Sequence, residues 1–281
     1  MHPPLIERVF SLHVLGTVLV LGGLFLGGAG CTSSAERAES PFVPADTVAS
    51  AVDRDSALAV LTALRRTAFD SAFAALDDYR FMRYVRTEQM MPAGTTTAVR
   101  SYALRYPAGG GRGTIQRRDS AGTFRSGGLF GRVAPDRDPA ARPPNVAAQM
   151  LPDQPAYVEP RTREAFRYAL RADSLRDGTP VHVLTVRARN RGTGREQGVR
   201  YARLLIHRSS NQLIGLALVR DDQVLLFGED SQLSLRLRRA PDGTWVPHVA
   251  RVRASVHVPF RSPRQFRTVS AFYAYESSSA D

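Results

Sequence analysis

The spacing of hydrophobic positions first predicts a helix. Between Asp53 and Asp78 the chain has neither glycine nor proline, and its apolar residues recur every three or four positions. These residues are Leu58, Leu61, Ala68, Phe69, Ala72, Phe73 and Leu76. The pattern predicts one long amphipathic helix, which Asp53 or Asp55 caps. Its apolar stripe must pack on a large partner surface, since an isolated helix gains little stability from propensity alone.

Strand-like segments follow the helix in two expected hairpins. They are Tyr79–Met91 with Thr96–Tyr106, and Gly113–Arg118 with Thr123–Ser126. Pro92-Ala93-Gly94 separates the first pair and Asp119-Ser120-Ala121-Gly122 the second, and both compositions favour turns. From Gly127 to Pro160 the chain contains seven prolines. We expect a long loop there, and a loop of this length inside a compact domain is usually functional or mobile.

The C-terminal part contains eight further strand candidates separated by short turns. They are Ala165–Ala172, Pro180–Arg189, Val199–His207, Leu213–Arg220, Gln223–Phe227, Gln232–Arg239, Trp245–Val258 and Phe266–Tyr275. The expected turns include Asp221-Asp222 between the fourth and fifth candidates. Because connections this short join antiparallel neighbours, the pattern predicts a β-meander.

Two of these strands alternate cleanly between apolar and polar residues. Leu233, Leu235 and Leu237 alternate with serine and arginine, and Val252 and Val256 belong to a run that alternates with arginine, serine and histidine. One face of the sheet is therefore expected to be buried and the other solvated. The fold class predicted is α+β, mainly β. It is a large, curved, unclosed antiparallel sheet, a half-barrel, with one long helix and the proline-rich loop covering its concave face.

Cys31 is the only cysteine, and it follows a hydrophobic N-terminal segment. A short head with one arginine, an apolar run and a stretch of small residues are typical of an export signal. The segment resembles a bacterial lipoprotein signal at Ala29, Gly30 and Cys31, although Gly28 occupies the place where that family usually has leucine. The resemblance implies cleavage before Cys31 and fatty acylation, such as palmitate, of that residue. An uncleaved membrane anchor and an ordinary secretory signal remain alternatives.

These features predict four parts of the chain. Residues 1–30 are the lipoprotein signal peptide, 31–46 a flexible tether, 47–276 the curved β-sheet domain and 277–281 a disordered tail. All three interpretations of the N-terminus place the rest of the chain outside the cytoplasm, and the lipoprotein signal predicts the cell envelope. Thr32, rather than aspartate, follows Cys31. By the sorting rule of well-studied lipoproteins, this favours the outer membrane, with the domain facing the periplasm.

The chain is strongly basic, with a net charge of +12 that comes entirely from arginine, because it contains no lysine. The arginines are scattered singly along strand-like segments, so we interpret most of them as solvated side chains and predict no nucleic-acid partner. With a single cysteine, the fold cannot depend on disulfides.

A signal of this type, an early amphipathic helix and a long meander resemble the LolA/LolB carriers of lipoproteins and their relative RseB. A sequence pattern common in that superfamily is similar to three successive segments of this chain: Gly178–Val186, Tyr201–Arg208 and Asn211–Ile214. The resemblance covers roughly Asp53–Glu276. It implies a helical lid and an interior suited to acyl chains. The residues we expect to contact such a ligand are Phe69, Phe73, Leu233, Leu235, Leu237, Val252 and Val256.

The sequence contains no recognisable catalytic motif. Gly-x-Ser-x-Gly, His-Glu-x-x-His and Cys-x-x-Cys are absent. His248 and His257 lie nine residues apart on one predicted strand, so they point to opposite faces and do not suggest a shared metal site. We therefore predict no enzyme activity, no metal and no cofactor.

Two functions are consistent with the sequence. The first is a lipid-anchored envelope protein that binds acyl chains or lipidated proteins in a hydrophobic cavity, as a carrier or sensor. The alternative is an outer-membrane-anchored scaffold with a filled core, which uses its surface for protein partners. A hollow or filled interior distinguishes them, and the oligomeric state stays open.

Overall fold

The computed structural model describes residues 54–65, 67–124, 138–143, 145, 157–176, 178–189, 199–224, 227–257 and 264–277. All of them belong to one compact unit, Glu39–Asp281. The described helices are α2 (Arg54–Thr62) and α3 (Ala68–Ala74), with short 3₁₀ turns η3 (Ala75–Asp78) and η5 (Arg163–Ala165). None of these helices is long and apolar enough to cross a bilayer.

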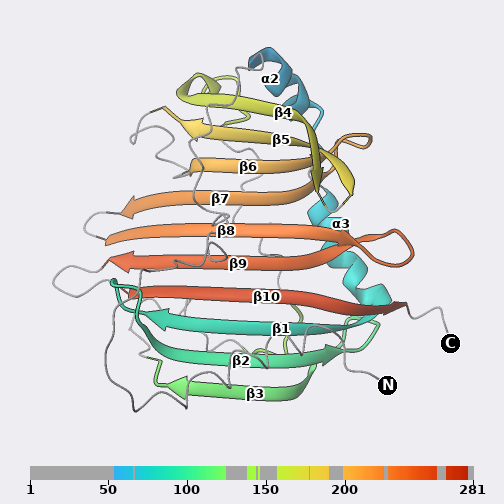
Figure 1. The fold of residues 1–281 in the computed structure, drawn as a ribbon, viewed down its shortest axis with the longest axis vertical. Coiled ribbons are helices and arrows are strands. Elements are labelled where there is room, and N and C mark those ends of the chain that lie inside the picture. The colour runs from blue at the N-terminus through green and yellow to red at the C-terminus, as the bar shows by residue number, and fades with distance from the viewer. Residues whose placement is uncertain are drawn as a thin grey trace, which may run out of the picture. The chain divides into compact units, whose positions relative to one another are not determined.

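The strands form one ten-stranded antiparallel sheet within the described residues (Figure 1). They are β1 (Tyr79–Met90), β2 (Thr96–Tyr106), β3 (Thr114–Gly122), β4 (Phe166–Arg176), β5 (Thr179–Ala188), β6 (Val199–His207), β7 (Leu213–Val224), β8 (Phe227–Arg239), β9 (Trp245–His257) and β10 (Arg264–Ser277). Their order is β3-β2-β1-β10-β9-β8-β7-β6-β5-β4. The predicted fold class, an unclosed and mainly β structure, is confirmed.

Pairing of β1 with β10 joins the N-terminal hairpin to the C-terminal meander. The two strands are in register from Tyr79↔Ser277 to Met90↔Gln265, with one irregularity near the start. All other neighbours in the sheet are consecutive strands. The chain therefore begins its sheet in the middle, and β3 and β4 end at opposite edges.

Two predicted turns are instead parts of strands. Asp119 to Gly122 continue β3, which pairs with β2 from Arg105↔Thr114 to Ala98↔Gly122. Asp221 and Asp222 continue β7, opposite Asp230 and Glu229 of β8. In both places a long neighbouring strand extends the ladder through residues that favour turns locally. The predicted second short hairpin was wrong, and the eight C-terminal candidates form seven strands, β4 to β10.

The predicted long helix is divided into α2 and α3, and Arg65 explains the break. The amide of Arg65 donates to the Asn211 carbonyl at 2.8 Å, and the Leu213 amide donates to the Arg65 carbonyl at 3.1 Å. Because the turn between β6 and β7 binds both backbone groups of Arg65, they are not available for helical hydrogen bonds. Packing then differs on the two sides: α2 packs on β4, whereas α3 packs on β7 and β9.

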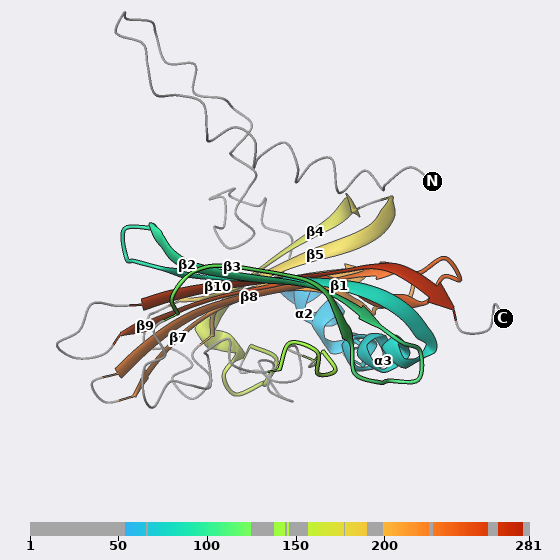
Figure 2. The same cartoon turned by 90° about the horizontal axis from the view of Figure 1, so that it is seen from below.

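Both helices lie on the same side of the sheet, and strand β1 bends around α3 (Figure 2). We call this side the inner face. It carries the main buried cluster, which includes Leu184, Leu204 and Leu216. The outer face is not uniformly polar as predicted. There, Val181, Val183 and Ile214 form a smaller buried cluster, against which Leu205 and Trp245 pack.

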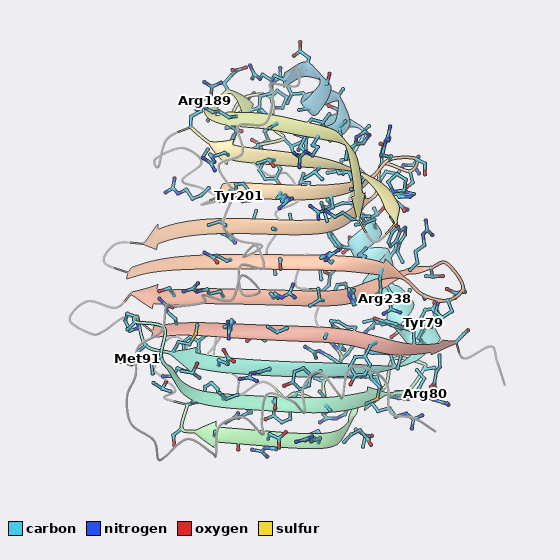
Figure 3. All side chains as sticks on the ribbon, viewed as in Figure 1. Tyr79, Arg80, Met91, Arg189, Tyr201 and Arg238 are labelled. Carbon is cyan, nitrogen blue, oxygen red and sulfur yellow. The ribbon has the colours of Figure 1, made fainter. Side chains whose placement is uncertain are left out.

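Arginine side chains are distributed widely over the sheet. In Figure 3, Arg189 lies near the β4 end of the sheet, and Arg80 lies near the opposite end. One arginine group is organised: Arg86 and Arg267 both form ion pairs with Glu88, whose side chain is nearly enclosed. The arginines are therefore scattered along the sheet, and Arg86 with Arg267 shows that they are not all single.

The hydroxyl of Tyr168 links the edge strand β4 to the residues that precede it in the chain. It donates to the Tyr157 carbonyl at 2.7 Å and lies 3.1 Å from the Arg163 carbonyl. Burial raises the pKa of Tyr168 to about 12. The folded state therefore retains this proton at pH values where the unfolded chain releases it.

We expect the stability of the fold to fall as the pH rises from about 10 to about 12, since Tyr168 has a higher pKa folded than unfolded. Below pH 10 the contribution is fully present. Urea unfolding across this range measures it, with Tyr168→Phe as the comparison. The variant should lose less stability than the wild type between the two pH values. If the unfolding free energy of both proteins depended on pH in the same way, the raised pKa would not belong to Tyr168.

Gly122 ends β3 in a conformation that requires glycine. Its φ is +70°, and a Cβ there would lie 2.2 Å from the Thr97 carbonyl oxygen. Gly94, in the turn between β1 and β2, has a φ of +86° but open space around it. The two positions therefore share the unusual φ and differ in the clash.

Gly122→Ala should detach β3 from β2, whereas Gly94→Ala should impose only the conformational cost of about 1–2 kcal/mol. Amide hydrogen exchange resolves the difference. In Gly122→Ala, amides of β3 should exchange at least about tenfold faster than in the wild type. The same change in both variants would show that the clash has no effect.

Candidate ligand-binding face

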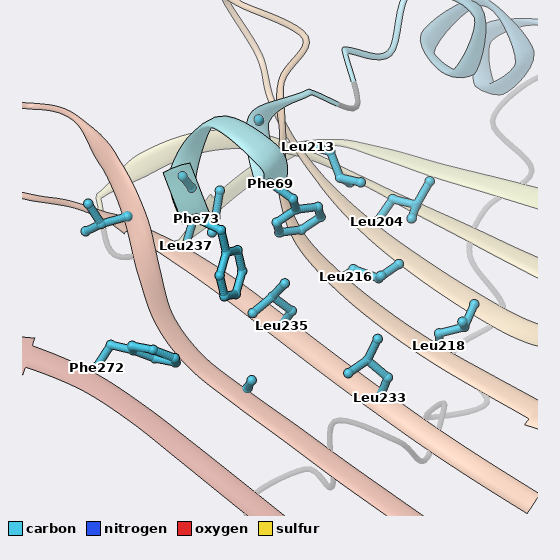
Figure 4. Packing of buried hydrophobic residues seen from close by; sticks show 14 of the residues in the cluster. Phe69, Phe73, Leu204, Leu213, Leu216, Leu218, Leu233, Leu235, Leu237 and Phe272 are labelled. Carbon is cyan, nitrogen blue, oxygen red and sulfur yellow. The ribbon is translucent and has the colours of Figure 1, made fainter. Parts of the chain in front are cut away.

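A block of leucines occupies the centre of the inner face. Leu233 and Leu235 of β8 are fully buried, and Leu237 is 7% exposed. Leu218 pairs with Leu233 and Leu216 with Leu235 across the β7–β8 ladder. Period-two alternation places all of them on one side of their strands. The result is a continuous aliphatic surface over neighbouring strands (Figure 4).

Helix α3 covers this surface with two phenylalanines. Phe69 and Phe73 are 2% and 5% exposed, and they lie one turn apart on the helix. Figure 4 shows both rings between the helix and the leucines. Phe73 also meets the Phe272 ring of β10 edge-on, with centroids 6.3 Å apart. In this structure aromatic side chains therefore fill the space beneath α3.

The predicted contact residues fall into three groups. Phe69, Phe73, Leu233, Leu235 and Leu237 belong to one buried cluster. Val252, which pairs with Leu233, is partly buried and packs against that cluster. Val256 pairs with Glu229 in the β8–β9 ladder, and its side chain lies outside the described part. Ligand binding by these residues stays a prediction, as does acylation of Cys31, which lies outside the described residues.

An aromatic wall continues the inner face across β1, β2 and β10. The Phe81 and Tyr106 rings stack with centroids 4.8 Å apart, and Phe81 also lies 6.2 Å from Phe272. Phe81 and Phe272 are almost fully buried. These residues were not among the predicted contacts, because the pairing of β1 with β10 that brings them together has no local signal.

The described part of the proline-rich segment is fastened beside α3. Arg142 forms an ion pair with Asp77 at 2.8 Å, directly after the helix. Asn145 donates to a carboxylate oxygen of Asp70 on α3 at 2.7 Å. The Tyr106 hydroxyl lies 3.0 Å from the carbonyls of Pro139 and Ala141. Helix α3 and the described residues of this segment thus lie side by side, whereas cover of the inner face by the whole Gly127–Pro160 loop stays a prediction.

Arg83 is a cation on the largely apolar inner face. It belongs to β1 and stands opposite Phe272 of β10 and Leu104 of β2. Its guanidinium donates to Ser270 Oγ at 3.0 Å and lies 5.5 Å from the centroid of the Phe272 ring. Burial lowers the pKa of Arg83, although an arginine remains charged at neutral pH. The sequence analysis did not identify this residue.

His207 and Ser210 form the contact most similar to a nucleophile–base pair. The two side chains are 2.8 Å apart across the turn between β6 and β7. No described carboxylate orients the imidazole, and its ring packs edge-on against Trp245 at 5.8 Å. Burial and the charge of Arg239 lower the pKa of His207. We interpret the pair as a turn-stabilising contact, because the third member of a catalytic triad is missing among the described residues.

Metal ligands do not gather in the described part of the chain. No group of three or more His, Cys, Asp or Glu side chains there is placed to hold an ion. The described inner face offers contact with hydrocarbon and, at Arg83, a positive charge that can attract an anion.

Comparisons with known proteins give structural similarities only. No protein-family model matches the chain, and no curated protein matches it. A putative outer membrane lipoprotein-sorting protein domain from Vibrio parahaemolyticus is 10% identical, with a TM-score of 0.31, covering 82% of this chain and 95% of that one. A LolA superfamily protein from Nitrosomonas europaea is 11% identical, with a TM-score of 0.23, covering 81% and 94%.

A third match is a DUF1329 family protein from Desulfovibrio piger, which is 15% identical with a TM-score of 0.27. It covers 76% of this chain and 93% of that chain. Similarities at these TM-scores do not establish membership of a family. The LolA-like assignment made from the sequence therefore remains a prediction, and the function has to be argued from the inner face itself.

Leu235→Ala should destabilise the fold by about 2–5 kcal/mol, because it leaves a cavity at the centre of the inner face. Urea unfolding measures the change in free energy. Ile115→Ala is the control, since Ile115 is 43% exposed on β3 and should change stability by less than about 0.5 kcal/mol. Similar effects of the two substitutions would mean that the leucine block does not support the fold.

Proposed function

We propose that this protein is an envelope lipoprotein, anchored to the membrane through Cys31, that binds acyl chains on the inner face of its sheet. The observation that carries the proposal is the aliphatic surface of β7 and β8 beneath a short, separate helix. An acyl chain gains about 0.8 kcal/mol for each methylene group that it removes from water. A surface of packed leucines supplies such an environment.

The break between α2 and α3 supports a mechanism for entry. Helix α3 is seven residues long, and the residues before it are fixed to the sheet through the backbone of Arg65. Displacement of α3 would withdraw Phe69 and Phe73 from the leucines and open the surface to hydrocarbon. A ligand chain would then replace the two rings as the cover of the inner face, so that the apolar surface stays buried in both states.

A specific observation also favours the alternative function. Phe69 and Phe73 already fill the space beneath α3, as expected for an anchored scaffold with a solid core. The two proposals share the lipid anchor and differ in whether the rings leave the sheet. Both place the protein in the envelope, as expected from its N-terminus, with the outer membrane as the predicted site.

Lipid extraction from the purified full-length protein, followed by mass spectrometry, separates the two proposals. A Cys31→Ser variant lacks the acylated thiol, so any acyl species extracted from it is bound non-covalently. We expect this variant to yield acyl species in amounts comparable to the protein, and to take up a fluorescent fatty acid. A variant that yields no acyl species and takes up no probe would contradict the acyl-binding proposal and favour the scaffold.

The wild-type chain provides the matched measurement of the anchor. Intact mass analysis should show cleavage before Cys31 and the added mass of fatty acyl groups. An uncleaved N-terminus, or an unmodified Cys31 thiol, would contradict the lipoprotein assignment without affecting the inner face.

A further inference from the structure

Arg83 places a positive charge at the border of the apolar face. Its strand neighbour Phe272 contacts Phe73, which covers the leucine block. The residue keeps some exposed surface, so one side of it remains accessible. A ligand whose chain lay where Phe73 now packs would therefore bring its end close to the guanidinium.

The hydrogen bonds of Arg83 are incomplete. Its Nε is fully enclosed and has no hydrogen-bond partner among the residues that the structure describes. Within the described part of the chain, the other nitrogens reach neutral oxygens, at 3.0 Å in Ser270 and 3.5 Å in Tyr106. No described carboxylate forms an ion pair with this arginine. A partly enclosed guanidinium without a counter-ion costs free energy, because it has lost water and gained no opposite charge.

We propose that Arg83 binds the acidic head group of the acyl ligand, so that the preferred ligand is an anionic amphiphile with a carboxylate or phosphate at one end. This inference rests on the proposed function, because it assigns the head group of a chain bound on the inner face. A planar guanidinium binds a carboxylate or phosphate through two parallel hydrogen bonds. Nε is one of the donors that such a bidentate contact would use.

The position of Arg83 also predicts how the ligand lies. The head group would bind between β1 and β10, next to Ser270, which would add a hydroxyl donor. The chain would run from Phe272 towards Leu235 and Leu233, across β9. Neutral esters and alcohols of equal length would gain the same hydrocarbon contacts but leave Arg83 without a counter-ion.

The test compares a 16-carbon fatty acid, labelled with a fluorophore at its terminal methyl end, with the methyl ester of the same molecule. Both are titrated below their aggregation concentrations into the full-length wild-type protein and three variants. Arg83→Met removes the charge and keeps much of the side-chain volume, and Arg83→Lys keeps a charge without the planar fork. Arg251→Met is the control, because Arg251 is a half-buried arginine on the outer face, opposite Ser234.

We expect the wild type to bind the acid at least about tenfold more tightly than the ester. A ratio of this size is what one charge-assisted hydrogen bond contributes to the binding free energy. In Arg83→Met the ratio should fall to about one while ester binding persists. Arg83→Lys should give an intermediate ratio, and Arg251→Met should keep the wild-type ratio. Competition by lysophosphatidic acid and by free phosphate distinguishes a lipid phosphate from inorganic phosphate as the anion.

Three outcomes would overturn the inference. Equal binding of acid and ester by the wild type would refute a head-group site and leave acyl binding intact. A preference for the acid that survives in Arg83→Met would place the anion elsewhere. Failure of the wild type to bind either probe would refute the proposed function together with the inference. If Arg83→Met does not fold, the inference is tested by the ratio of acid to ester affinity in the wild type and in Arg83→Lys.

Discussion

Burial of the inner face is the constraint on which the rest of the structure depends. The sheet has ten strands within the described residues, and its edge strands β3 and β4 do not meet. A sheet that does not close cannot bury its own apolar face, so other elements must cover it. Here the cover consists of two short helices and the segment around Arg142. Because α3 is so short, much of the contact over the leucine block comes from Phe69 and Phe73.

The same constraint links stability to function. A cover made of few residues is the part of the fold that can separate from the sheet at the lowest cost, because it forms few of the buried contacts. The leucines beneath it belong to strands that are paired on both sides by long ladders, so we expect them to stay in place. A rigid apolar surface under a small cover is suited to exchange one hydrocarbon contact for another. In the proposed function, a filled core and an acyl-binding surface would be two states of the same face.

Local sequence patterns predicted most strands, because alternation and turn residues act within a few positions. Leu233, Leu235 and Leu237 are one example, and their burial follows directly from the period of two. The division of the helix had no local signal. Residues between α2 and α3 are compatible with a helix, and the break comes from the contact of Arg65 with a turn almost 150 residues later. The β1–β10 pairing and the extension of β7 through Asp221 and Asp222 likewise depend on distant partners.

The candidate site was predictable to a similar extent. Its aliphatic and phenylalanine components follow from periodicity, whereas Arg83 does not, because β1 carries arginines on both faces. Arg83 and Arg86 are three residues apart and so lie on opposite faces of β1, and only the register against β10 shows that Arg83 stands opposite Phe272. The most direct test of an acyl site beneath α3 is amide hydrogen exchange of the full-length protein, measured with and without a bound fatty acid. If α3 covers the acyl site, its amides should exchange faster and the β7–β8 amides more slowly when the fatty acid is bound. Unchanged exchange in α3, with protection confined to the outer face or absent, would contradict this account.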